Sequence, residues 1–297
     1  MKKIILLVMI LVLSLSLVGC SSTASVNSDK IVIGGKNFTE QDILVYIMRD
    51  LIEAKTNLKV EVKPYLGGTN VVAQALERGD LDLYAEYTGT GLMHILGEKV
   101  INDPEAAYQK VKQMYKDKKQ IVWLKPLGFN NTYTLSVRAD QAKQLGLEKI
   151  SDLLEHQSSL TLGVTHEFLE RDDGYRGVKK VYGLNFGTAK GMDPGLTYAA
   201  CRDGKVDVID AFATDGRIPA FNLKVLKDDK NFFPPYYAAP IVREDTLKKH
   251  PELAEVLNLL AGKLDDKQMS TLNAKVDLEK QDPQQVAREW LKSQGLI

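Results

Sequence analysis

The chain has 297 residues, of which 44% are hydrophobic and 26% are charged, and its 39 basic residues balance its 39 acidic residues. This composition is ordinary for a globular protein, and the length is sufficient for more than one domain. Because the charges balance and no basic patch or stripe stands out, we do not expect nucleic acid as a partner.

Disulfides, metal sites and catalysis find little support in the sequence. After Cys20 only Cys201 remains, which is too few cysteines for an intrachain disulfide or a Cys-rich metal site. The histidines show no HxxxH or HExxH spacing: His94, His156, His166 and His250. There is also no GxSxG segment, so we expect no metal, no cofactor and no enzyme. An extracytoplasmic hydrolase stays open as an alternative, because catalytic groups can assemble from distant segments.

The first residues predict export. Two lysines are followed by an apolar run, Ile4–Val18, and then by Gly19-Cys20 and a polar stretch. This order is typical of a secretory signal, and the cysteine at the cleavage site resembles a bacterial lipobox. We therefore expect a signal peptide at residues 1–19, lipidation of Cys20 and a tether at residues 20–29. The alternative is an ordinary secretory signal that contains this cysteine by chance.

Beyond the tether, short β-rich runs alternate with amphipathic helical segments, the pattern of an α/β protein. The first predicted elements, in chain order, are a strand at 31–33, a helix at 39–51 with Thr39 as N-cap, a strand at 58–62 and a helix at 71–78. We expect the C-terminal stretch, residues 265–297, to be helical and to pack on the outside of the first lobe.

One local pattern occurs twice and predicts two lobes. In 75–83 and in 200–208, a helix ends, a glycine follows and a strand begins. An aromatic residue lies eight positions beyond each glycine, Tyr87 in the first copy and Phe212 in the second. We infer two similar α/β lobes, each with a parallel-type sheet, although coincidence can also produce such a pattern. Open α/β sheets bind ligands at the carboxyl ends of strands, so both aromatics are expected to face one cleft between the lobes.

Five motifs, in this order, resemble those of the osmoprotectant-binding proteins of ABC importers. They are Lys36–Gln41, Glu86–Thr90, Gly128–Tyr133, Thr214–Ile218 and Phe232–Tyr236. That group binds glycine betaine, carnitine and choline, and the resemblance runs from Lys36 to the C-terminus.

The resemblance implies a type II periplasmic-binding-protein fold, with two α/β lobes joined by a two-crossover hinge and a ligand cleft between them. We place lobe one at residues 30–129 plus 235–297 and lobe two at residues 130–234. Residues at the crossovers would then couple ligand capture to closure of the lobes.

The resemblance also implies a cage for the ligand cation, made by Tyr87, Tyr133, Phe212 and Tyr236 with Asn131. A trimethylammonium group has no N–H donor, but each aromatic face attracts it by about 0.5–2 kcal/mol. Phe212 stands where the family commonly has tyrosine, and Asn131 where relatives often have aspartate. Both departures bear on which ligand is preferred.

For the ligand carboxylate, the resemblance implies Lys36, Thr90 and Arg171, which supply cationic and hydroxyl donors. Glu167 is expected to contact and orient Arg171 without contacting the ligand itself. The alternative for Arg171 is a surface salt bridge with neighbouring carboxylates.

These expectations combine into one function. The protein is predicted to be an extracytoplasmic, monomeric substrate-binding lipoprotein that captures a small quaternary ammonium solute of the glycine betaine class. Its partners would be the ABC permease, the ATPase subunits of the importer and the membrane, through the lipid anchor. An ergothioneine-binding protein is the alternative within this class, because related proteins share the run Glu170–Tyr175.

Overall fold

The computed structural model describes residues 30–297. The predicted signal peptide, the tether and Cys20 lie outside the described residues. Within residues 30–297, no helix combines the length and the apolar character needed to cross a membrane.

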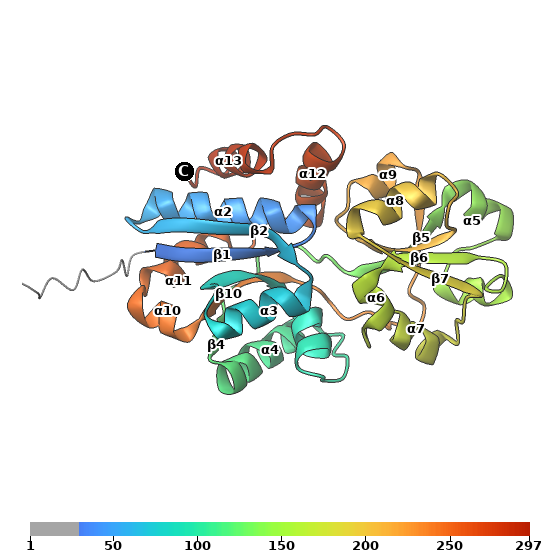
Figure 1. Cartoon of the computed structure of the whole chain (residues 1–297), viewed down its shortest axis with the longest axis horizontal. Helices are drawn as coiled ribbons and strands as arrows, with labels where there is room; N and C mark the ends of the chain where they lie inside the picture. Colours follow the sequence, from blue (N-terminus) through green and yellow to red (C-terminus); the bar gives the residue numbers. More distant parts are fainter. Residues whose placement is uncertain (1–29) are drawn as a thin grey trace, which may run out of the picture. The chain divides into compact units, whose positions relative to one another are not determined.

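The first lobe is built from the two ends of the described chain (Figure 1). Its N-terminal part comprises β1 (Lys30–Lys36), α2 (Thr39–Lys55), β2 (Lys59–Gly67), α3 (Thr69–Arg78), β3 (Leu83–Tyr87), a π-helix (Thr90–Ile95), α4 (Pro104–Lys119) and β4 (Ile121–Trp123). Its C-terminal part comprises β10 (Ala238–Arg243), α10 (Glu244–Lys249), α11 (Glu252–Leu257), a 3₁₀ helix (Asn258–Leu260), α12 (Asp266–Asp277) and α13 (Pro283–Ser293).

The second lobe is one continuous segment. It comprises β5 (Tyr133–Arg138), α5 (Ala139–Leu145), a 3₁₀ helix (Ile150–Glu155), β6 (Thr161–Thr165), α6 (His166–Glu170), α7 (Tyr175–Tyr182), β7 (Thr188–Met192), α8 (Pro194–Arg202), β8 (Val208–Phe212), α9 (Arg217–Ala220) and β9 (Leu223–Leu226).

Each lobe holds a five-stranded sheet, and the two sheets have equivalent topologies. The strand orders are β2-β1-β3-β10-β4 and β7-β6-β8-β5-β9. The third strand of each order, β3 or β8, pairs in parallel with β1 or β6. On its other side it pairs antiparallel with β10 or β5. The expectation of parallel-type sheets is therefore wrong for one strand in each sheet, and that strand is the one that enters from the other lobe.

The helix–glycine–strand pattern folds as predicted. Gly79 ends α3 with φ +84°, and Gly204 follows α8 with φ +69°. Both angles lie in the left-handed region, which glycine adopts without a Cβ clash. Each glycine thereby turns the chain into the strand that ends at Tyr87 or Phe212.

Alternation along β3 places helices on both faces of the first sheet. Leu83 and Ala85 belong to the core under α2, whereas Tyr84 belongs to the core under α3 and α4. In the second lobe, Val208 and Ile209 likewise belong to different cores, and Ile209 packs with α8. The α-helices therefore bury the sheets from both sides and leave the strand ends to form the site.

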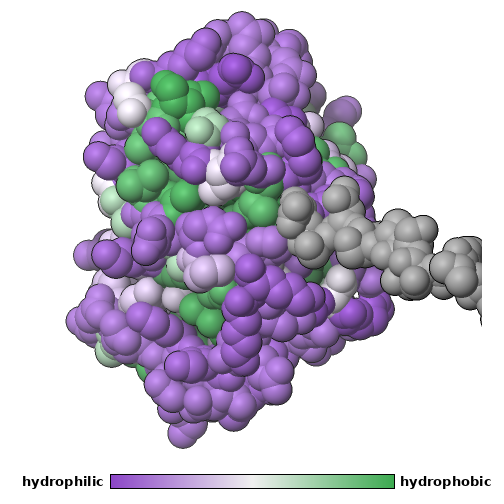
Figure 2. Space-filling model, turned by 90° about the vertical axis from the view of Figure 1, so that its left-hand side faces the viewer, coloured by the Kyte–Doolittle hydropathy of each residue, from purple (hydrophilic) through white to green (hydrophobic). Residues whose placement is uncertain are grey.

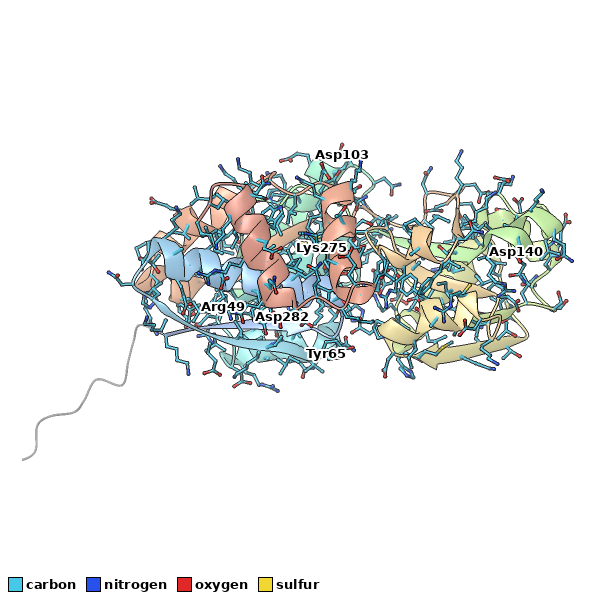
Figure 3. All side chains as sticks on the ribbon, turned by 90° about the horizontal axis from the view of Figure 1, so that it is seen from above. Arg49, Tyr65, Asp103, Asp140, Lys275 and Asp282 are labelled. Atoms are coloured by element: carbon cyan, nitrogen blue, oxygen red, sulfur yellow. The ribbon has the colours of Figure 1, made fainter. Side chains whose placement is uncertain are left out.

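The observed elements extend the predicted ones. The first predicted helix continues to Lys55, and the second predicted strand continues to Gly67. The prediction of Thr39 as an N-cap is wrong, because Phe38 holds that position and the Thr39 hydroxyl donates to Asp277 instead. The C-terminal helices α12 and α13 lie over α2 (Figure 3), and Trp290 is buried there.

Two segments connect the lobes, residues 124–132 and 227–237, and they are hydrogen-bonded to each other. Asn130 and Tyr237 form an antiparallel bridge. The amide of Asn131 donates to the carbonyl of Tyr236 at 3.1 Å, and the amide of Tyr236 donates to Asn130 Oδ1 at 2.7 Å. The crossovers therefore form a short ribbon immediately before β5 and β10.

The surface at one end of the molecule is mostly hydrophilic, with small separate hydrophobic areas (Figure 2). Scattered apolar surface of this kind is ordinary for a folded protein. This face therefore gives no reason to place a binding site there.

Candidate ligand-binding site

A pocket lies at the strand ends of both sheets. Lys36 and Tyr87 end neighbouring strands of the first sheet, and Phe212 ends β8 in the second. Tyr133 begins β5 directly opposite Phe212, because an antiparallel strand starts where its neighbour ends. About 630 Å³ of the space here is not filled by protein atoms, part of it open solvent.

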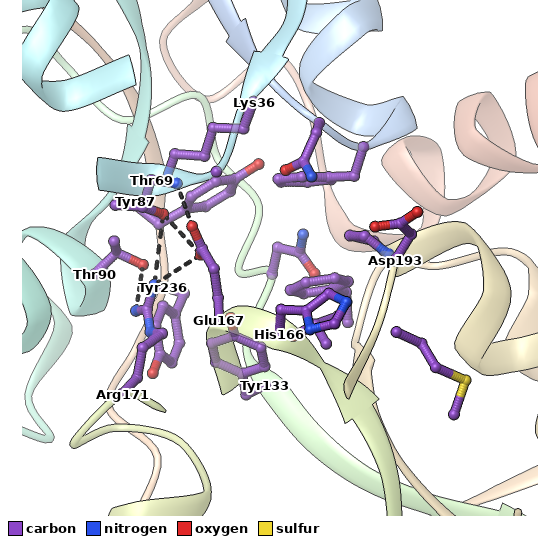
Figure 4. A pocket seen from close by; sticks show the side chains of 18 residues that line it. Lys36, Thr69, Tyr87, Thr90, Tyr133, His166, Glu167, Arg171, Asp193 and Tyr236 are labelled. Atoms are coloured by element: carbon purple, nitrogen blue, oxygen red, sulfur yellow. Dashed lines mark hydrogen bonds and ion pairs between the residues drawn. The ribbon is translucent and has the colours of Figure 1, made fainter. Parts of the chain in front are cut away.

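The pocket is lined by residues from both lobes (Figure 4). The lining residues are Lys36, Asn37, Phe38, Gly68, Thr69, Tyr87, Thr90, Asn131, Tyr133, Thr165, His166, Glu167, Arg171, Met192, Asp193, Pro194, Phe212 and Tyr236. All nine side chains predicted for the cage, for the ligand carboxylate and for the support of Arg171 are among them.

Five aromatic rings form a continuous row along one wall. Tyr87 lies 6.3 Å from Phe38, Phe38 stacks on Phe212 at 5.2 Å, and Phe212 lies 5.2 Å from Tyr133. Tyr236 then meets Tyr133 edge-on, at 5.6 Å and 90°. Such a wall offers several π faces without adding an anionic group, which suits a cation that lacks N–H donors.

A buried carboxylate, Glu40, lies behind this wall. It accepts hydrogen bonds from the Tyr87 hydroxyl at 2.7 Å, from Asn131 Nδ2 at 2.8 Å and from Asn273 Nδ2 at 3.1 Å. It also accepts from the hydroxyl of Thr214. Burial raises the pKa of Glu40, although these hydrogen bonds oppose the rise. Asn131 therefore acts as a donor to a protein carboxylate, a role that an aspartate could not fill when ionised.

Lys36 is paired within the protein. Its Nζ lies 2.5 Å from Glu86 Oε1, and both side chains are buried. Glu86 also accepts from the Tyr84 hydroxyl and from the amide of Tyr87. The Lys36 ammonium lies 5.2 Å from the Tyr87 ring centroid, so it makes a cation–π contact with Tyr87 at that end of the aromatic row.

Arg171 forms the salt bridge with neighbouring carboxylates that the alternative predicted, but its side chain is buried and not at the surface. Its Nε and Nη2 contact the two oxygens of Asp173 at 2.7 and 2.6 Å, and Nη2 also donates to Thr90 at 3.1 Å. The Tyr236 hydroxyl donates to the same Asp173 at 2.8 Å. Burial alone would raise the pKa of Asp173, but Arg171 and Tyr236 outweigh it and hold the pKa below its ordinary value.

Glu167 reaches from α6 in the second lobe to the start of α3 in the first (Figure 4). Its carboxylate accepts from the amide of Thr69, and from the Thr69 hydroxyl at 3.1 Å. Arg171 Nη1 lies 3.5 Å from the same carboxylate. Glu167 therefore links the lobes directly as well as contacting Arg171.

Sequence reasoning missed several wall residues. Phe38 lies in a motif that carried the resemblance, yet it was not placed in the cage. Thr69, His166 and Asp193 have no local pattern that marks them. Three other tyrosines, Tyr65, Tyr198 and Tyr237, are not among the lining residues.

Within residues 30–297, no group of three or more His, Cys, Asp or Glu side chains has a metal-binding arrangement. Arg171 and Lys36 already pair with carboxylates, and the aromatic wall carries no acid–base pair. The pocket therefore has an aromatic end and a hydrogen-bonding end.

Two α/β lobes with a cleft lined from both sides define the class of the two-lobed substrate-binding proteins. A family model described as the substrate binding domain of the ABC-type glycine betaine transport system, OpuAC, matches residues 29–293. The chain belongs to this family, and it is a substrate-binding protein of an ABC importer.

Three relatives illustrate the similarity. The carnitine transport binding protein OpuCC of Listeria monocytogenes is 42% identical over 296 residues, covering 98% of this chain and 96% of the relative. A crystal structure of a glycine betaine/carnitine/choline ABC transporter has a TM-score of 0.73 and 39% identity, covering 90% of this chain and 99% of that one. The ergothioneine transport permease/ergothioneine binding protein EgtU of Helicobacter pylori is 35% identical over 273 residues. That match covers 92% of this chain but only 49% of EgtU, so this chain spans about half of that relative.

Proposed function

We propose that the protein captures a quaternary ammonium solute of the glycine betaine class and delivers it to the permease and ATPase of its importer. The observation that carries this proposal is the row of five aromatic rings that ends in a polar corner within one pocket. The cation would lie against Tyr87, Tyr133, Phe212 and Tyr236, beside Asn131. A ligand carboxylate would lie toward Lys36, Thr90 and Arg171.

The proposal includes the remaining features of the molecule. The lobes would divide at residues 30–129 plus 235–297 and 130–234, with the crossover ribbon as hinge. The protein would act as a monomer without catalysis, held outside the cell membrane by a lipid on Cys20. Replacing Cys20 by serine would then release it from the membrane fraction, and retention of the variant there would refute lipidation at this residue.

A ligand panel tests the function. Glycine betaine, proline betaine, carnitine, choline and ergothioneine are screened by thermal shift, followed by calorimetry. A ligand that binds only the folded state stabilises it by about 2.7 kcal/mol at 100 times its dissociation constant. Glycine and dimethylglycine serve as matched ligands, because they keep the carboxylate and lack the full trimethylammonium. Absence of any response to the quaternary ammonium compounds at millimolar concentration would refute the proposal.

Ergothioneine is the second candidate, because the relative EgtU is named for it. Ergothioneine also carries a trimethylammonium and a carboxylate, so the same two ends of the pocket would serve it. Ergothioneine also has an imidazole-derived ring, which glycine betaine lacks, so it requires more of the pocket volume. Direct calorimetry with ergothioneine and glycine betaine separates the two candidates.

A further inference from the structure

A carboxylate of the protein already occupies the polar end of the pocket, where a ligand carboxylate is proposed to bind. Glu167 accepts from the amide and the hydroxyl of Thr69, and it lies 3.5 Å from Arg171 Nη1. Figure 4 shows these contacts beside Thr90. The donors available to an incoming carboxylate at this corner are therefore shared with a side chain of the protein.

The position of Glu167 is favourable for an anion. Thr69 is the first residue of α3, and no side chain caps this helix start from within its own segment. A free amide at a helix start attracts negative charge. Gly68 makes the approach possible, because a Cβ at that position would overlap with Glu167 Oε1.

The charges on the pocket wall point the same way. The two cations, Lys36 and Arg171, each pair with a buried carboxylate behind the wall, Glu86 and Asp173. Glu167 remains about one-third exposed beside them. Asp193 also lines the pocket and makes no ion pair with any residue in the described part of the chain. Together, the charged residues in and directly behind the pocket lining therefore carry more negative than positive charge.

We propose that Glu167 sets the selectivity of this site, by disfavouring ligands that carry a carboxylate relative to ligands that are purely cationic. The inference rests on the proposed function, because it assumes a quaternary ammonium ligand. A cation such as choline leaves Glu167 on Thr69 and gains from its charge. A zwitterion such as glycine betaine brings a second carboxylate to the same corner, and it must displace Glu167 or share its donors.

The test is the ratio of two dissociation constants, measured by calorimetry for glycine betaine and for choline. Glu167→Gln keeps the shape of the side chain and removes its charge, so it relieves the repulsion of the zwitterion and weakens the attraction of the cation. We expect the ratio of the glycine betaine constant to the choline constant to fall by about tenfold or more. Glu167→Ala removes the group altogether and is expected to shift the ratio in the same direction.

Glu170→Gln is the matched control. Glu170 lies on the same helix and is 70% exposed, where it pairs with Arg176. This substitution makes the same chemical change outside the pocket, and we expect the ratio to stay within about twofold of the wild type.

The outcomes separate the two proposals. If the wild type binds both ligands and neither Glu167 variant shifts the ratio, the role of Glu167 is refuted and the proposed function stands. A shift toward choline would also refute it. If the wild type binds no compound of the panel, the proposed function itself fails, and the selectivity role falls with it.

Discussion

Replacing Tyr236 separates the contribution of its ring from that of its hydroxyl. The side chain is buried, its ring meets Tyr133 edge-on at 5.6 Å, and its hydroxyl donates to Asp173 at 2.8 Å. Tyr236→Phe removes only the hydroxyl, whereas Tyr236→Ala also removes the ring. The two variants therefore test whether the ring face or the hydrogen bond to Asp173 supports ligand binding.

The expected magnitudes follow from the contacts. A hydrogen bond to a charged group contributes about 1.5–3 kcal/mol, so Tyr236→Phe should lower the free energy of unfolding by that amount. Removing a buried aromatic ring costs about 3–5 kcal/mol, so Tyr236→Ala should be the less stable variant. For the ligand, one aromatic face contributes about 0.5–2 kcal/mol, which corresponds to roughly 2- to 30-fold in affinity. Only the alanine variant should lose this contribution of the ring to ligand binding.

Urea denaturation gives the free energy of unfolding, and calorimetry with glycine betaine gives the dissociation constant. We expect Tyr236→Phe to bind within about threefold of the wild type and Tyr236→Ala to bind roughly tenfold more weakly. If the phenylalanine variant loses as much affinity as the alanine variant, the hydroxyl and Asp173 govern binding, and the reasoning from the ring is refuted. If both bind as the wild type does, Tyr236 makes no part of the cage.

Three further outcomes concern the buried Asp210 and Asn131 and the partly buried Phe38. Burial raises the pKa of Asp210 from 3.8 to about 7, so its contribution to stability falls as the pH rises from about 4 to 7. Between pH 4 and pH 7, the Asp210→Asn variant should therefore lose about 4 kcal/mol less stability than the wild type. The free energy of unfolding of both proteins, measured across this pH range, checks this. Asn131→Asp would place an anion 2.8 Å from Glu40, so we expect at least about 2 kcal/mol of destabilisation at pH 8 and less at pH 4. Phe38→Leu keeps an apolar side chain and removes a π face, so glycine betaine affinity should fall by about 2- to 30-fold.

Each of these outcomes has a result that contradicts it. Parallel pH profiles for the wild type and Asp210→Asn would show that the carboxyl does not titrate in this range. Equal melting temperatures for Asn131→Asp and the wild type at pH 8 would show that Glu40 is protonated or has moved. For Phe38, unchanged glycine betaine affinity of Phe38→Leu in a well-folded sample would contradict the prediction.

The sequence predicted those parts of the fold that depend on local pattern. The repeated helix–glycine–strand segments placed Tyr87 and Phe212 at equivalent strand ends, since backbone geometry past a helix end is set by the glycine itself. The strand directions were less accessible. An antiparallel neighbour such as β10 is contributed by a segment far along the chain, and no local signal reveals its partner.

The sequence indicated several residues of the pocket better than it indicated the ion pairs and hydrogen bonds among them. The resemblance named nine of the residues that line the pocket, but it did not give the pairing of Lys36 with Glu86. A salt bridge of Arg171 with a neighbouring carboxylate was expected only at the surface, not in a buried pair with Asp173. Glu40 was missed altogether, because its partners Asn131 and Thr214 are separated from it by 91 and 174 positions. Hydrogen bonds between such distant segments leave no spacing in the sequence.

The position of β10 in the first sheet has a consequence for the order of folding. β10 lies between β3 and β4, yet it follows the whole of the second lobe in the chain. A growing chain that ends at residue 237 can complete the second sheet, whose strands all lie between Tyr133 and Leu226, while β4 still lacks its neighbour. The lobe that begins first is thus expected to finish last, and its long-range pairing should set the slow step of refolding. A fragment of residues 130–234 is therefore a better candidate for independent folding than any N-terminal fragment.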